Sequence, residues 1–66
     1  MAKIQLNGKK ISLKNRTSIK QLLLNYKLLN KRVAIELNGK IIPSTKYNIY
    51  LKDKDIMEIV HFIGGG

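Results

Sequence analysis

The residues best suited to chemistry are the three glycines that end the chain, Gly64, Gly65 and Gly66. Glycine has no Cβ, so this segment is thin enough to enter a narrow channel in another protein. A partner enzyme could activate the accessible Gly66 carboxylate as an acyl-adenylate, and the carbonyl could then pass to sulfur, nitrogen or oxygen. Small residues also collect at fraying chain ends, so the glycines alone are weak evidence.

The remaining residue types argue against a catalytic or metal site within the chain. There is no cysteine, so any sulfur must be brought in by a partner. His61 is the only histidine, and a histidine with no orienting carboxylate nearby in sequence is better explained as a surface or partner-contact residue. The acids are too few and too scattered for a metal cluster: Glu36, Asp53, Asp55 and Glu58.

Length and charge limit the class of protein. A chain of 66 residues forms one domain with a thin core and little room for an active-site cavity. The net charge of +9 would suit a nucleic-acid partner, but the basic residues are mostly lysines without a dense run or stacking aromatics. No apolar run is long enough for a membrane span or a signal peptide. The abundance of lysine, isoleucine and asparagine is typical of A/T-rich codons, so we expect a protein made and used in the bacterial cytoplasm or the plastid stroma.

The first half of the chain predicts a hairpin and a helix. Residues 3–6 and 11–13 alternate around Asn7-Gly8, a pair typical of a type I′ turn, which places Ile4, Leu6, Ile11 and Leu13 on one face. Ser18 and Gln21 form a capping-box pattern, so a helix should begin at Ile19. Its buried stripe is predicted to consist of Ile19, Leu22, Leu23 and Tyr26.

The second half predicts another hairpin and a final strand. Residues 33–37 and 40–43 flank a second turn at Asn38-Gly39. Residues 44–51 fit either a short strand or an irregular connection carrying core side chains, and Asp53 and Asp55 should bond local backbone N–H groups. The strand over residues 56–62 has apolar groups on both faces, which indicates a central strand or an outer face that meets a partner. Pairing on both edges would hold the root of the glycine tail rigid.

These elements indicate an α+β fold, with one main helix packed on one face of a mixed sheet. We expect residues 1–63 to form the domain and residues 64–66 a flexible tail. The whole chain resembles the ThiS family of β-grasp, ubiquitin-like sulfur carriers. The resemblance is carried by Asn7-Gly8, Pro43 and residues 18–26, 33–39, 51–53 and 58–66.

The resemblance implies a carrier for thiamine biosynthesis and not an enzyme. An adenylating enzyme of the ThiF type would use ATP and Mg²⁺ to activate Gly66. Sulfur from a cysteine desulfurase or a sulfur relay protein would then give a Gly66 thiocarboxylate, which a thiazole synthase of the ThiG type would consume. Gly64 and Gly65 would thread into the partner, while His61, Phe62 and Ile63 would dock against it.

The sequence departs from the family at Lys54, where glycine is common; a lysine held at positive φ there would cost on the order of 1 kcal/mol.

Two other functions remain open. The chain could serve another pathway, as molybdopterin-type carriers do, or act as a ubiquitin-like modifier of lysines. The second alternative is a basic nucleic-acid-binding domain.

Overall fold

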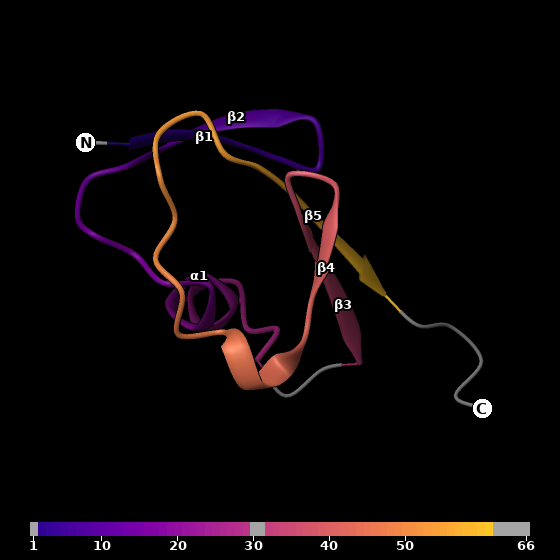
Figure 1. Cartoon of the computed structure of the whole chain (residues 1–66). Coiled ribbons are helices and arrows are strands. Elements are labelled where there is room, and N and C mark those ends of the chain that lie inside the picture. The colour runs from indigo at the N-terminus through magenta and orange to yellow at the C-terminus, as the bar shows by residue number, and fades with distance from the viewer. Residues whose placement is uncertain (1, 30–31, 62–66) are drawn as a thin grey trace.

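The computed structural model describes residues 2–29 and 32–61 and shows a five-stranded sheet with one α-helix (Figure 1). The strand order is β2-β1-β5-β3-β4, with β1 and β5 parallel and the other neighbours antiparallel. The predicted mixed sheet with one main helix is therefore confirmed. The elements are β1 (Ala2–Leu6), β2 (Lys9–Leu13), α1 (Ile19–Asn25), β3 (Val33–Leu37), β4 (Lys40–Ile42), the 3-10 helix η1 (Ser44–Lys46) and β5 (Ile56–His61).

Both hairpins turn at the predicted Asn-Gly pairs. In the first turn φ is 49° at Asn7 and 83° at Gly8, and in the second it is 52° at Asn38 and 86° at Gly39. Positive φ at both central positions is the requirement of a type I′ turn, whose twist matches that of the flanking strands. The turns fix the register of both hairpins.

Within the described residues, no helix is long and apolar enough to cross a membrane.

The helix begins where the capping box predicts. The Ser18 hydroxyl accepts a bond from the Gln21 N–H at 3.1 Å, and the Gln21 side chain accepts one from the Ser18 N–H at 3.4 Å. These two bonds satisfy backbone donors that the first turn of a helix leaves unpaired.

The helix ends earlier than its apolar stripe suggests. A Schellman motif closes it: the Lys27 N–H donates to the Leu24 carbonyl and the Leu28 N–H to the Leu23 carbonyl. Tyr26 is the C-cap and its side chain is 48% exposed, so its predicted place in the buried stripe is wrong. The backbone leaves helical geometry at this residue, and the tyrosine side chain stays partly exposed beside the core.

One hydrophobic core joins the helix to a single face of the sheet. Ile19, Leu22 and Leu23 from α1 are buried in the same cluster as residues from β1, β2, β3 and β5. The predicted shared face of the first hairpin is confirmed, because Ile4, Leu6 and Leu13 are buried and Ile11 packs against them. The other buried members of the core are Ile35, Leu51, Met57 and Ile59.

The connection over residues 44–55 is irregular rather than a strand. After η1 only an isolated bridge joins Tyr50 to Ser18; Leu51 is buried and Tyr47 half-buried, but Ile49 is 37% exposed. Asp55 accepts from the nearby Lys52 N–H at 2.8 Å, as expected of a turn. Asp53 instead accepts from the Lys3 N–H at 2.8 Å, so its predicted local bond is wrong. Its carboxylate ties the turn to β1.

Lys54 has a φ of 72°, the conformation that disfavours a side chain. We expect Lys54→Gly to raise the free energy of unfolding by about 1 kcal/mol, because glycine adopts this conformation without steric cost. The midpoint of thermal unfolding should rise by about 4–8 °C in a domain of this size. Lys52→Gly is the matched control, since it removes the same charge where φ is not positive. If both variants were stabilised equally, the gain would come from removal of the charge, and the backbone strain at Lys54 would not explain it.

Candidate functional site

The candidate site is the end of β5, from which the glycine tail departs. β5 lies at the centre of the sheet, between β1 and β3, as its two apolar faces predicted (Figure 1). It pairs with β3 as far as His61, but its ladder with β1 extends only over Ile56 and Met57. Two-sided pairing is therefore present where β5 starts, whereas its last residues pair in the sheet only with β3.

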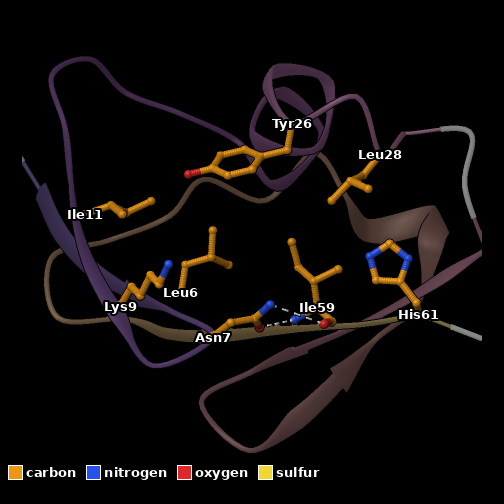
Figure 2. A pocket seen from close by; sticks show the side chains of 8 residues that line it. All are labelled: Leu6, Asn7, Lys9, Ile11, Tyr26, Leu28, Ile59 and His61. Carbon is orange, nitrogen blue, oxygen red and sulfur yellow. Dashed lines mark hydrogen bonds between the residues drawn. The ribbon is translucent and has the colours of Figure 1, made fainter.

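Beyond the end of the β1 ladder, the side chain of Asn7 forms hydrogen bonds with the backbone of β5. The Ile59 N–H donates to Asn7 Oδ1 at 2.8 Å, and Asn7 Nδ2 donates to the Ile59 carbonyl at 3.4 Å (Figure 2). The amide thus forms the pair of bonds that a neighbouring strand would form. This contact holds β5 two residues before its end at His61.

Asn38 binds the beginning of β5 in a similar way, on the opposite edge of that strand. Its Oδ1 accepts from the Ile56 N–H at 2.8 Å and its backbone N–H donates to the Ile56 carbonyl at 2.7 Å. Its Nδ2 donates to Asp55 Oδ1 at 2.9 Å. In each hairpin turn, the asparagine side chain therefore binds the backbone of the central strand β5. The sequence did not predict these bonds, because the preference of type I′ turns for Asn-Gly already explained why an asparagine precedes each glycine.

The outer face of the sheet carries apolar and acidic side chains near this site. Ile56 is 49% exposed and Val60 is 52% exposed, while Met57 and Ile59 on the other face are buried. Glu58 lies directly opposite Glu36 on β3, and like charges in this position destabilise a sheet. That this outer face meets a partner stays a prediction.

The predicted site residues divide into those the structure describes and those it does not. His61 is exposed at the end of β5. The tail residues Gly64, Gly65 and Gly66 and the docking residues Phe62 and Ile63 lie outside the described residues. Over residues 2–29 and 32–61, no group of three or more His, Cys, Asp or Glu side chains could hold a metal ion.

Comparisons with known proteins agree on one family. The ThiS family profile matches residues 3–66. The chain is 48% identical over 65 residues to the sulfur carrier protein ThiS of Bacillus subtilis (strain 168), covering 96% of this chain and 98% of that protein. The fold matches the crystal structure of the thiamine biosynthesis protein ThiS from Geobacter metallireducens with a TM-score of 0.81 and 28% identity, covering 97% and 99% of the two chains.

A further relative is a larger protein. The thiazole synthase of Magnetococcus marinus (strain ATCC BAA-1437 / JCM 17883 / MC-1) is 35% identical over 65 residues, which are 97% of this chain and 20% of that protein. One segment of that synthase is therefore similar to nearly all of this chain.

Proposed function

The chain belongs to the ThiS family, and from this membership we propose that it carries sulfur as a thiocarboxylate on Gly66, for thiazole formation in thiamine biosynthesis. It is a sulfur carrier protein and not an enzyme. The observation that carries the proposal is the match to the family profile, which runs through the last glycine. The similarity to a segment of a thiazole synthase supports a thiazole synthase as the partner that takes the sulfur.

The chemistry assigns the chain one reacting group and leaves the rest to partners. A ThiF-type enzyme with ATP and Mg²⁺ joins the Gly66 carboxylate to AMP and releases pyrophosphate. A sulfur nucleophile, generated by a cysteine desulfurase or relay protein, then attacks the carbonyl carbon and expels AMP. Sulfide gives the thiocarboxylate directly, whereas a protein persulfide gives an acyl disulfide that a thiol must reduce.

The fold supports this role by fixing the point from which the tail starts. The pairing of Val60 and His61 with β3 and the Asn7 amide bonds to Ile59 hold the end of β5 against the domain. A positioned origin lowers the entropy lost when the tail enters a partner enzyme. Gly64 and Gly65 thread the channel, and His61, Phe62 and Ile63 form its docking edge in this proposal.

The test is the intact mass of the chain after incubation with a ThiF-type enzyme, ATP, Mg²⁺, a cysteine desulfurase, cysteine and a thiol reductant. We expect the gain that corresponds to one sulfur replacing one oxygen, located on Gly66 by fragmentation. Because the chain has no cysteine, transferred sulfur cannot reside on a thiol side chain. An unchanged mass, with an enzyme shown active on its own carrier, would contradict the proposal.

The main artefact in this measurement is methionine oxidation. One oxygen added to Met1 or Met57 gives nearly the same mass change as the expected exchange. Two controls separate the cases: omission of ATP should abolish the sulfur product only, and iodoacetamide should alkylate a thiocarboxylate but not a sulfoxide.

A further inference from the structure

A hollow on the inner side of the sheet lies beside the root of the tail (Figure 2). We call it the helix-end hollow. It is lined by residues from the end of β1, the first hairpin turn and β2, from the segment after α1, and from the end of β5, and its volume is about 230 Å³. His61, the last described residue before the tail, forms part of its wall. Whatever approaches the root of the tail from this side meets the hollow.

The hollow lies on the part of the inner face of the sheet that the helix does not cover. Helix α1 has only seven residues. The Schellman motif turns the chain at Tyr26 and Lys27, which leaves the far end of the inner face uncovered. Apolar side chains form the floor: Leu6, Ile11, Leu28 and Ile59.

The rim supplies hydrogen-bond donors. Lys9 presents an ammonium group, Tyr26 a hydroxyl and His61 an imidazole, and all three residues are exposed. The fourth polar residue, Asn7, already uses its amide on the Ile59 backbone. An apolar floor with a cationic, donor-rich rim is complementary to an apolar group that lies next to a carboxylate.

The size and openness of the hollow favour a protein side chain over a small ligand. Pockets for cofactors and drug-sized molecules have volumes of about 300–1,000 Å³ and enclose most of the ligand. This hollow is smaller, and its rim residues are exposed to solvent. A single large apolar side chain of a partner loses only its rotamer freedom on entering such a site, because translational and rotational entropy is lost once for the whole partner.

The reach of the tail places the hollow against the partner. Five residues follow His61, and a fully extended segment of that length spans at most about 17 Å. When Gly66 enters an enzyme, the surface around His61 must therefore lie close to the rim of that enzyme. The helix-end hollow is part of this surface.

We propose that the helix-end hollow receives an apolar side chain of the thiazole synthase, flanked by a carboxylate that pairs with Lys9. This inference rests on the proposed function, which supplies the synthase as partner. It adds a second contact, on the inner side of the sheet, to the contact made by the tail itself.

Two neighbouring lysines provide a matched test. Lys9 and Lys10 are exposed on the same strand and point to opposite faces; Lys10 lines a different hollow with Lys3 and Lys54. Lys9→Glu and Lys10→Glu make the same change in charge. With the thiazole synthase encoded by the same genome, we expect Lys9→Glu to weaken binding about tenfold or more, and Lys10→Glu to change it by less than about twofold.

A second measurement detects occupancy of the helix-end hollow without any substitution in the chain. Methyl NMR spectra of the unmodified chain, titrated with the synthase, should shift the signals of Ile11, Leu28 and Ile59, and show intermolecular contacts there. Equal effects of the two lysine variants, unshifted floor methyls, or no binding of the unmodified chain would each overturn the inference. Failure of the mass measurement would instead overturn the proposed function, so the two failures are distinguishable.

Discussion

Deletion of Gly66 should reduce formation of the sulfur product by at least about 100-fold. The truncated chain still ends in a glycine carboxylate, but this group lies about 3.5 Å short of its position in the full chain. Displacement of a reacting group by as little as about 1 Å can cost about 100-fold in rate. The measurement is the initial rate of product formation by intact mass, at equal concentrations of the two chains.

The controls for this deletion separate chemistry from folding. The core residues all lie between Ile4 and Ile59, so the truncated chain should unfold at the same temperature as the full chain. Leu24→Ala removes an exposed side chain on the helix and should leave the rate unchanged. Activation of the truncated chain at the normal rate would show that the last residue does not set the reach of the tail.

Replacement of Asn7 by glycine should lower the free energy of unfolding by about 1–3 kcal/mol. Glycine accepts the turn conformation, but the N–H and the carbonyl of Ile59 lose the partners that the Asn7 amide provides. A domain of this length has a total stability of roughly 3–10 kcal/mol, so the loss is substantial. Urea unfolding measures it, and amide exchange at Ile59 should become faster.

Asn48→Gly is the control for the entropy of the added glycine. Asn48 is exposed, and no hydrogen bond of its side chain is found among the described residues. Its replacement should therefore cost no more than about 1 kcal/mol. Equal losses in the two variants, or unchanged exchange at Ile59, would mean that the Asn7 amide does not hold β5.

Much of the fold follows from local sequence signals. The Asn-Gly pairs require positive φ and therefore determine both hairpins and their register. Ser18 and Gln21 satisfy backbone donors within one turn, so the start of the helix could be predicted to the residue. The end of the helix could not, because Lys27 stands where glycine is the usual signal and the Schellman bonds form with a lysine instead.

The sequence by itself indicated the chemistry that we propose for this protein. The chain has no cysteine, and the resemblance of residues 58–66 to sulfur carriers indicated both the reaction and Gly66 as its site. Only the tertiary structure decided how β5, the strand that precedes the glycines in sequence, is held. Asn7 and Ile59 lie 52 positions apart, and Lys9, Tyr26 and His61 reach one hollow from three separate elements. Such contacts depend on how the elements pack against one another, and the periodicity of residues along the chain therefore does not predict them.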